Sequence, residues 1–192
     1  PTTRHLAIIG SGAVAQAHLR YVQDLRPWQS IRLYSPSLAN KPAAELARLQ
    51  ALDPRLQLVA RLEDATEGAD VIMLCTSSAG PVLDPSSLGK PALITSISTN
   101  APRAHEVPPA ALAQMQVYCD YRRTTPGCAG EMLIAEEQHG WDSAAILGDL
   151  PELLSEQAPL PDAERPVFFR SIGLGLEDIA LANALYHLRR PQ

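Results

Sequence analysis

A glycine-containing turn near the start of the sequence constrains the fold of this chain more than any other feature. Residues 10–15 read G-S-G-A-V-A; they follow an apolar run over residues 5–9 and open a helical pattern over residues 13–26. In this setting Gly10 permits a tight turn, Gly12 lets backbone N–H groups approach a pyrophosphate, and a small residue at 15 lets the helix pack close to the strand. The helix N-terminus adds partial positive charge. A lone G-x-G-x-x-A is a weak signal, but between a strand and a helix it predicts a dinucleotide-binding unit.

The rest of the sequence alternates short apolar runs with helical patterns, as parallel β/α units do. We expect seven strands, at residues 5–9, 30–34, 56–59, 70–75, 92–97, 116–119 and 167–170. We expect helices at residues 13–26, 41–52 (capped by Asn40), 63–67, 109–114, 132–138, 147–157 and 174–188. The pattern predicts an α/β fold with a Rossmann-like, doubly wound, mainly parallel sheet and helices on both faces. Right-handed crossovers favour the strand order 3-2-1-4-5-6.

Composition excludes several classes of function. The chain has 192 residues, 46% of them hydrophobic and 19% charged, and no apolar run approaches the ~18 residues of a membrane span. The net charge of −5, with only two adjacent basic pairs, argues against nucleic acid as a partner. Cys75, Cys119 and Cys128 lack the paired spacing of disulfides or a zinc site. We therefore expect a cytoplasmic protein without a metal site.

The end of the second expected strand bears on the choice between NAD and NADP. A carboxylate there would pair with the ribose 2′-hydroxyl of NAD and repel the 2′-phosphate of NADP. Residues 34–41 contain no acid; Ser35, Ser37 and Asn40 can donate hydrogen bonds to a phosphate, and Lys41 adds positive charge. The same residue types also suit a turn and a helix cap. NADP is the favoured cofactor, with NAD as the alternative.

Polar residues also follow the fourth and fifth expected strands. Thr76 and Ser77 begin one such segment, and residues 98–100 form the other. Ligands of open α/β sheets bind outside the carboxyl ends of the strands, so this position favours a role in binding. Ser, Thr and Asn are also common in loops of every kind.

Several segments resemble blocks of the ornithine cyclodeaminase/μ-crystallin family. They cover nearly the whole chain, and the last of them is the most specific: residues 9–18, 69–72, 76–83, 100–106, 130–131 and 169–178. Members of this family depend on NAD(P). They include ornithine cyclodeaminases, an archaeal type of alanine dehydrogenase, ketimine reductases and Δ1-pyrroline-2-carboxylate reductases, and μ-crystallin also binds thyroid hormone.

The resemblance implies roles for individual residues. It implies that the pyrophosphate is contacted by Ser11, Ala13 and Val14, and that the adenosine ribose or its 2′-phosphate is held by Ser35, Ser37 and Asn40. It implies a cofactor contact for Thr76. It also implies that Ser171 and Ile172 belong to a backbone segment near the nicotinamide carboxamide. Val14 stands where many members carry Gln. Pro36 stands where the family commonly has Arg, which weakens the argument for NADP.

The resemblance also implies a domain organisation. Family members place an N-terminal domain, which dimerises and holds the substrate carboxylate, before the Rossmann domain. We expect residues 1–172 to form the NAD(P)-binding Rossmann domain. Residues 173–192 would form a C-terminal helix that packs on an N-terminal domain absent from this chain, with a naturally short homologue as the alternative. A homodimer is the family habit.

Asn100 is the departure from the family that bears on chemistry, because cyclodeaminases carry Asp there. Oxidising an amino acid needs a group that accepts the proton of the amine, and an amide cannot do so. Reducing a preformed imine needs only a residue that orients the nitrogen while the nicotinamide supplies hydride. Asn100 also suits a turn before Pro102. We expect an NAD(P)H-dependent reductase of a cyclic imino acid of the Δ1-pyrroline-2-carboxylate or Δ1-piperideine-2-carboxylate type.

Two other functions stay open from the sequence. One is a non-catalytic NADPH- or ligand-binding protein of the μ-crystallin type, and the other is an ornithine cyclodeaminase or amino-acid dehydrogenase.

The sequence also predicts the surroundings of two further side chains. His18 is expected in the core, on a sheet-facing side of its helix shared with Val14, Tyr21 and Leu25. Glu106 is expected on the surface or at a cap.

Overall fold

The computed structural model describes residues 3–98 and 101–189. Within these residues, eight parallel strands form one sheet in the order β3-β2-β1-β4-β5-β8-β6-β7. Their bounds are β1 His5–Ile9, β2 Ser30–Tyr34, β3 Leu56–Val59, β4 Val71–Leu74, β5 Leu93–Ser96, β6 Gln116–Cys119, β7 Gly148–Asp149 and β8 Val167–Arg170.

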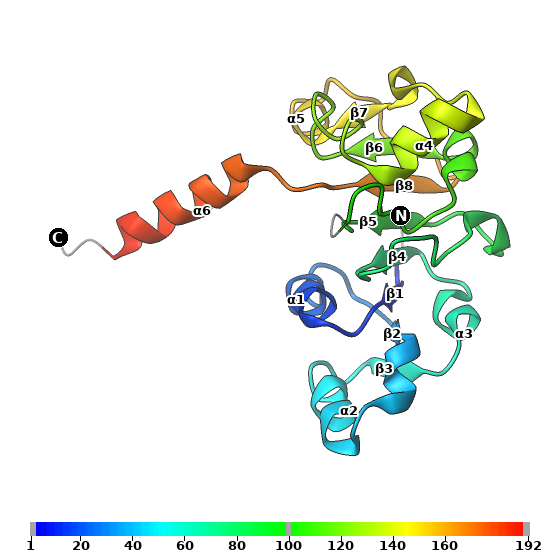
Figure 1. Cartoon of the computed structure of the whole chain (residues 1–192). Coiled ribbons are helices and arrows are strands. Elements are labelled where there is room, and N and C mark those ends of the chain that lie inside the picture. The colour runs from blue at the N-terminus through cyan, green and yellow to red at the C-terminus, as the bar shows by residue number, and fades with distance from the viewer. Residues whose placement is uncertain (1–2, 99–100, 190–192) are drawn as a thin grey trace.

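Helices cover both faces of this sheet (Figure 1). They are α1 Ala13–Val22, α2 Ala43–Gln50, α3 Leu62–Thr66, α4 Gly130–His139, α5 Leu150–Leu154 and α6 Gly175–Leu188, with 3-10 turns that include η1 Pro36–Asn40 and η3 Pro109–Gln114. Alternate residues of β1 point to opposite sides: Leu6 and Ile8 pack with α1 and α2, whereas Ala7 and Ile9 pack with α3, η3 and α4. The predicted Rossmann-like, doubly wound fold is confirmed.

The predicted strand order is wrong in its second half. The last strand, β8, lies between β5 and β6, so that Arg170 is in register with Ser96 on one side and Cys119 on the other. The crossover rule fixes the hand of each connection, but it does not say which strand follows β5. The position of β8 inside the sheet buries its side chains: Phe168 is fully buried in the core.

Two local predictions are also corrected. The helix expected over residues 147–157 begins only at Leu150, because Gly148 and Asp149 form the short strand β7. Asp149 then caps α5 in a reciprocal capping box with Glu152. Asn40 is not the cap of α2; it ends η1, and α2 begins after Pro42 without a side-chain cap.

The predicted inner face of α1 is wrong as well. The helix packs on the sheet through Ala15, Leu19 and Val22. The face that contains Tyr21 lies in solvent, where Tyr21 is 81% exposed. The side chain of His18 is half-buried, and its Nδ1 atom lies 2.9 Å from the carbonyl oxygen of Val14, one turn earlier in α1.

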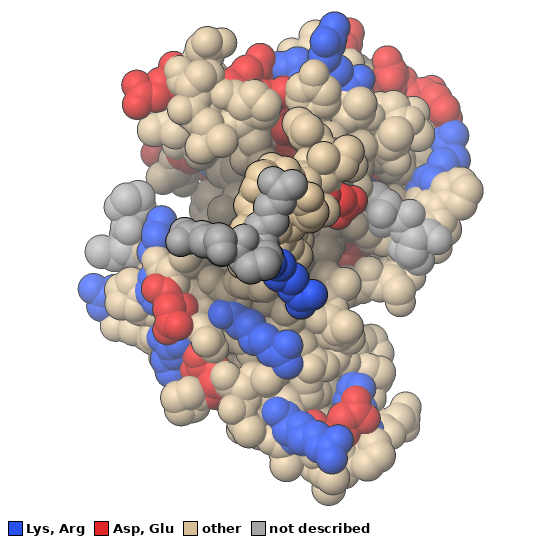
Figure 2. All heavy atoms as spheres, turned by 90° about the vertical axis from the view of Figure 1, so that its left-hand side faces the viewer, with Lys and Arg blue, Asp and Glu red and all other residues tan. Residues whose placement is uncertain are grey.

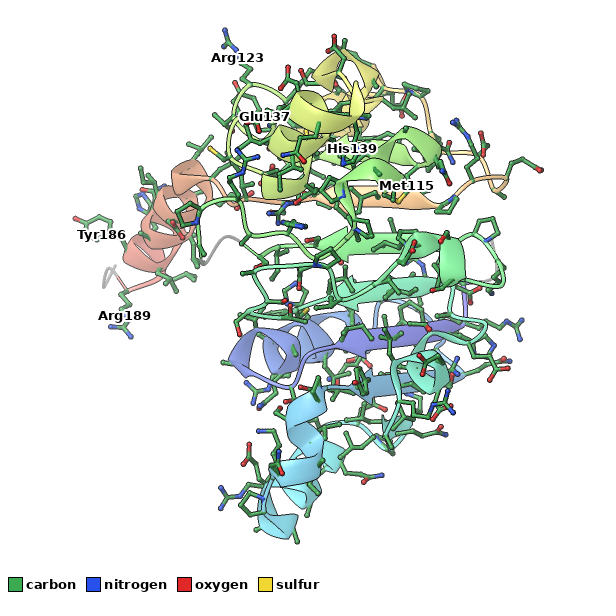
Figure 3. All side chains as sticks on the ribbon, turned by 45° about the vertical axis from the view of Figure 1, so that its right-hand side comes forward. Met115, Arg123, Glu137, His139, Tyr186 and Arg189 are labelled. Atoms are coloured by element: carbon green, nitrogen blue, oxygen red, sulfur yellow. The ribbon has the colours of Figure 1, made fainter. Side chains whose placement is uncertain are left out.

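Helix α6 projects away from the rest of the molecule (Figure 1). Its leucines and Ile179 are exposed, and no residue of the helix is buried. Tyr186 and Arg189 point away from the sheet (Figure 3). Figure 2 looks along α6 and shows the surface hollowed beside it. Among the described residues, no helix has the length and apolar character needed to cross a membrane.

Candidate functional site

The turn between β1 and α1 has the geometry that the sequence predicts. Gly10 has φ of 126°, and its N–H donates to the Tyr34 carbonyl oxygen at 2.8 Å. A Cβ atom on Gly10 would lie 2.3 Å from the carbonyl oxygen of Cys75, so only glycine fits between β1 and β4. Gly12 differs, because a Cβ atom there would meet nothing within 4 Å. Gly10 therefore allows β1 and β4 to pack closely, whereas Gly12 leaves open space at the N-terminus of α1.

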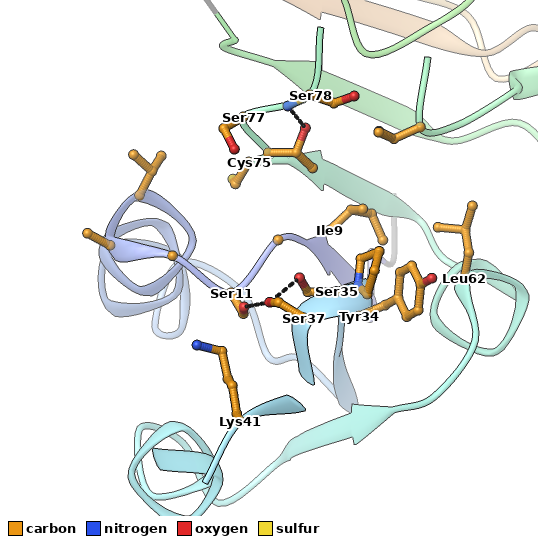
Figure 4. A pocket seen from close by; sticks show the side chains of 17 residues that line it. Ile9, Ser11, Tyr34, Ser35, Ser37, Lys41, Leu62, Cys75, Ser77 and Ser78 are labelled. Atoms are coloured by element: carbon orange, nitrogen blue, oxygen red, sulfur yellow. Dashed lines mark hydrogen bonds between the residues drawn. The ribbon is translucent and has the colours of Figure 1, made fainter. Parts of the chain in front are cut away.

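A cavity of about 740 Å³ lies over this turn (Figure 4). It is formed where β1, β2 and β4 end, which is the carboxyl edge of the sheet. Nine predicted cofactor contacts line it: Gly10, Ser11, Gly12, Ala13, Val14, Ser35, Ser37, Thr76 and Ser77. The fold thus brings together three segments that the sequence singled out separately.

The β2 side of the cavity is rich in hydroxyl groups. The Oγ atoms of Ser11 and Ser37 are 3.0 Å apart, and those of Ser37 and Ser35 are 2.9 Å apart (Figure 4). Lys41 also lines the cavity, and its ammonium group pairs with Glu45 one turn along α2. None of the described residues that line the cavity is acidic. This wall suits an anionic group.

Asn40, Ser171 and Ile172 do not line this cavity. The N–H of Ile172 donates to Asp120 at 2.8 Å, and the hydroxyl of Ser171 donates to the same carboxylate oxygen at 3.1 Å. Asn100, the predicted catalytic residue, lies outside the described residues. The roles predicted for these four residues stay predictions.

Asp120 is a buried carboxylate that the sequence analysis missed. It follows β6 and is 1% exposed. Burial alone would raise its pKa, but hydrogen bonds from Thr125, from the Ile172 N–H and from Ser171 hold the pKa below its ordinary value. The charged carboxylate therefore fixes the backbone that leaves β8. A position just past a strand end was its only sequence signal.

Glu106 was expected on the surface or at a cap, and this expectation is wrong, because it caps no helix and its partners are Thr76 and Ser96. Its side chain is fully buried. One carboxylate oxygen accepts from the Thr76 N–H at 2.9 Å and from the Thr76 hydroxyl at 2.7 Å, and the other accepts from the Ser96 hydroxyl at 2.8 Å. Glu106 therefore joins the ends of β4 and β5. Both donors of Thr76 are used in this way, so a ligand would meet its methyl or carbonyl group.

Cys75 also lines the cavity, at the point where β4 ends. Burial, with a smaller contribution from Glu106, raises the pKa of its thiol to about 12. The thiol therefore stays protonated at neutral pH and acts as a small apolar side chain.

Comparison with known proteins places the chain. The family model for the ornithine cyclodeaminase/mu-crystallin family matches residues 1–190. The chain belongs to this family. The NAD(P)H-dependent anabolic L-arginine dehydrogenase DauB of Pseudomonas aeruginosa, a curated relative, is 65% identical over 185 residues, which cover 96% of this chain and 58% of that protein. The ketimine reductase mu-crystallin of Mus musculus is 25% identical over 186 residues, which cover 97% of this chain and 56% of that protein.

Solved structures of similar proteins have the same fold. The Δ1-pyrroline-2-carboxylate reductase of Thermococcus litoralis, in complex with NADH and L-proline, matches with a TM-score of 0.84 and 19% identity over 97% of this chain and 58% of that one. The iminosuccinate reductase of Paracoccus denitrificans, in complex with NAD+, matches with a TM-score of 0.83 and 25% identity over 97% of this chain and 56% of that one. The chain thus spans less than two thirds of the length of these relatives.

Proposed function

We propose that the cavity binds NAD(P)H and that the chain is the coenzyme-binding part of an oxidoreductase that reduces a C=N bond beside a carboxylate. The open N-terminus of α1 carries the proposal, because the space beside Gly12 leaves its backbone N–H groups accessible to a diphosphate. Family membership supports the same conclusion. NADPH is the proposed coenzyme, with NADH as the alternative, because Ser35, Ser37 and Lys41 line the ribose side and none of the described lining residues is acidic.

The residues of this chain then divide the work. The turn at Gly10–Gly12 holds the diphosphate, and the hydroxyl groups on the β2 side hold the adenosine ribose. When bound, the reduced nicotinamide supplies hydride. Asn100 orients the imine nitrogen. The reductive direction suits an amide there, because an iminium ion arrives already protonated and no base has to remove a proton.

The first candidate substrate is the imine of 5-guanidino-2-oxopentanoate, the oxo acid that corresponds to L-arginine. The relative named an anabolic L-arginine dehydrogenase supports it. Ammonia condenses with the ketone, water leaves, and the resulting imine takes up a proton from water, which gives a protonated imine. Hydride then adds to carbon 2, the electron pair of the C=N bond moves to nitrogen, and L-arginine forms. The second candidate is a cyclic imino acid, supported by the more distant relatives named Δ1-pyrroline-2-carboxylate reductases.

The full-length enzyme with NADPH tests both candidates. We expect coenzyme oxidation with 5-guanidino-2-oxopentanoate only when ammonium is present. Δ1-Pyrroline-2-carboxylate, which already contains its C=N bond, would react without ammonium if the second candidate is correct. Coenzyme binding without oxidation by either substrate would support the non-catalytic alternative. Absence of binding to either coenzyme would contradict the proposal as a whole.

We also propose that residues 1–172 form the coenzyme-binding domain and that α6 packs on a region supplied by the N-terminal domain of the family. A helix with apolar residues on every side is normally enclosed by other protein. Leu176, Ile179 and Leu185 are all more than half exposed in this chain. The part of the relatives that this chain does not cover is large enough to supply that covering.

A further inference from the structure

Three serine side chains form a chain of hydrogen bonds on the β2 side of the coenzyme cavity (Figure 4). Ser11 lies in the turn between β1 and α1, Ser35 follows β2, and Ser37 lies in η1. The Oγ atom of Ser37 stands in the middle, 3.0 Å from that of Ser11 and 2.9 Å from that of Ser35. The chain of hydroxyl groups therefore joins the glycine turn to the loop after β2.

The surrounding structure holds the middle hydroxyl group in place. Ser11 is only 6% exposed, so its side chain has little room to turn away. The N–H of Gly10 donates to the carbonyl oxygen at the end of β2, which fixes the two loops side by side. Leu38 is buried in the same core as α1 and α2, and its N–H donates to the Ser35 carbonyl oxygen at 3.0 Å. Ser37 is thus exposed toward the cavity but held at its backbone.

The number of protons in this chain decides what Ser37 can offer a ligand. A serine hydroxyl group has one proton and two lone pairs, and in both pairs either oxygen can be the donor. When Ser11 and Ser35 both donate, the lone pairs of Ser37 are filled and its proton is free. When only one neighbour donates and Ser37 donates to the other, its proton is used and one lone pair is free. The middle hydroxyl group can therefore present either a donor or an acceptor.

The two coenzymes differ in this same property at the adenosine 2′ position. The 2′-phosphate of NADPH has only acceptor oxygens and needs a donor, whereas the 2′-hydroxyl of NADH can donate to an acceptor. A carboxylate at this position accepts only, and an arginine donates only, so each favours one coenzyme. Lys41 adds positive charge to the wall, but its ammonium group already pairs with Glu45. The serine chain suits both coenzymes.

We propose that Ser37 is the residue that lets one cavity take both NADPH and NADH, by donating to a 2′-phosphate or accepting from a 2′-hydroxyl. Ser11 is its positioning residue: the backbone of the glycine turn serves the diphosphate, while the Ser11 side chain acts on the ribose through Ser37. This inference rests on the proposed function, in which the cavity binds NAD(P)H.

Coenzyme binding by the full-length enzyme tests the proposal. Fluorescence of the reduced nicotinamide gives the Kd for three ligands: NADPH, NADH, and NADH that lacks the adenosine 2′-hydroxyl. Ser37→Ala removes both the donor and the acceptor. We expect Kd to rise about tenfold for NADPH, which loses a charge-assisted hydrogen bond, and about threefold for NADH, which loses a neutral one. The Kd for the 2′-deoxy ligand should not change.

Ser37→Asp keeps acceptors and removes the proton. Ser11 and Ser35 can both donate to the carboxylate, so the chain of hydrogen bonds survives this change. We expect the Kd for NADPH to rise about 100-fold through repulsion of the phosphate, and the Kd for NADH to stay close to that of the parent. An equal rise for both coenzymes would overturn the proposal.

Ser11→Ala tests the positioning role. The Kd for NADPH and for NADH should rise about threefold, because Ser37 loses one of its two neighbours, and the Kd for the 2′-deoxy ligand should not change. An equal rise for the 2′-deoxy ligand would mean that the Ser11 side chain acts on the diphosphate, which would overturn this role. Ser86→Ala is the control, because it removes an exposed serine hydroxyl in η2 Pro85–Ser87, outside the cavity.

The parent enzyme separates this inference from the proposed function. Absence of binding to either coenzyme would overturn both. Binding of only one coenzyme by the parent would overturn this inference and leave the proposed function standing. The same holds if Ser37→Ala weakens NADPH alone, or if it weakens all three ligands equally, because then Ser37 does not accept from the 2′-hydroxyl or acts only on the shape of the loop.

Discussion

The carboxylate of Glu106 accepts two hydrogen bonds from Thr76, at 2.9 Å from its N–H and at 2.7 Å from its hydroxyl. The pair joins the loop after β5 to the end of β4. The carbonyl oxygen of Glu106 also accepts from the N–H of Val82 at 2.8 Å, and Val82 lines the cavity. Glu106 therefore shapes this wall without touching the space that a ligand would occupy.

Replacing Glu106 with Gln should lower the free energy of unfolding by about 1–3 kcal/mol, because a neutral amide accepts weaker hydrogen bonds than a carboxylate and keeps only one acceptor oxygen for the three donors that face Glu106. Denaturant unfolding measures this change. Glu136→Gln, at an exposed position of α4, is the control and should leave the free energy of unfolding unchanged. A parent-like unfolding midpoint for Glu106→Gln would contradict the buried geometry.

The two glycines of the turn should respond differently to alanine. Gly10→Ala forces a Cβ atom into the Cys75 carbonyl group and should cost several kcal/mol of stability, on the order of the larger effects of single mutations. Gly12→Ala meets open space, so the melting temperature should stay near that of the parent while affinity for NADPH falls. Thermal unfolding and fluorescence titration with NADPH measure the two effects. Unchanged affinity in Gly12→Ala would remove the main support for the proposed coenzyme site.

Lys41 should determine preference for NADPH over NADH. Lys41→Met removes the cation from the wall of hydroxyl groups, and KM for NADPH should rise about tenfold, the loss of one charge-assisted contact. KM for NADH should change little, because NADH lacks the 2′-phosphate. Arg48→Met removes an exposed cation from α2, the helix that follows Lys41, and is the control. An equal rise in KM for both coenzymes would mean that Lys41 contacts the diphosphate or supports folding, and does not select for the 2′-phosphate.

Asp70 should make stability depend on pH in acid. Burial opposes ionisation, but Lys90 and the N–H groups of Arg4 and His5 lower the pKa of Asp70 to about 2. Because the folded pKa lies below the ordinary 3.8, the stabilisation is complete above pH ~4 and is lost as pH falls toward 2. Asp70→Asn should cost about 2 kcal/mol at neutral pH, and the difference from the parent should shrink over that acid range. A difference that does not depend on pH would contradict the ionic origin.

Helix α6 should be covered in the full-length enzyme. Ile179→Glu places a charge on its apolar surface, at a position that is exposed in this chain. We expect this substitution to reduce assembly, as light scattering would measure, and to leave the unfolding of residues 1–172 unchanged. Glu177→Gln, in the first turn of the same helix, is the control. Unchanged assembly in Ile179→Glu would mean that α6 does not contribute to an interface.

The features that the sequence predicts correctly are local. The turn at Gly10–Gly12 and strands such as β2 depend on residues close together in the chain, and their bounds agree with the structure. The nine cavity residues could be found because a parallel sheet places the ends of its strands at one edge.

The features that the sequence misses depend on distant partners. Glu106 looks like a surface residue until donors 10 and 30 residues away surround it. Nothing near Arg170 in the sequence indicates its buried ion pair with Glu131, and β7 is only two residues long, too short for any periodicity to appear. The inner face of α1 was misassigned because two apolar stripes are present on that helix, and only packing decides between them.

The place of β8 has a consequence for biosynthesis. Within the described residues, strands β6 and β7 join the remainder of the sheet through β8, which follows the other strands in the sequence. A ribosome must therefore release Arg170 before the two parts can join, and until then the inner edges of β5 and β6 stay open to wrong pairing. Nascent chains that stop before residue 167 should be a preferred substrate for chaperones.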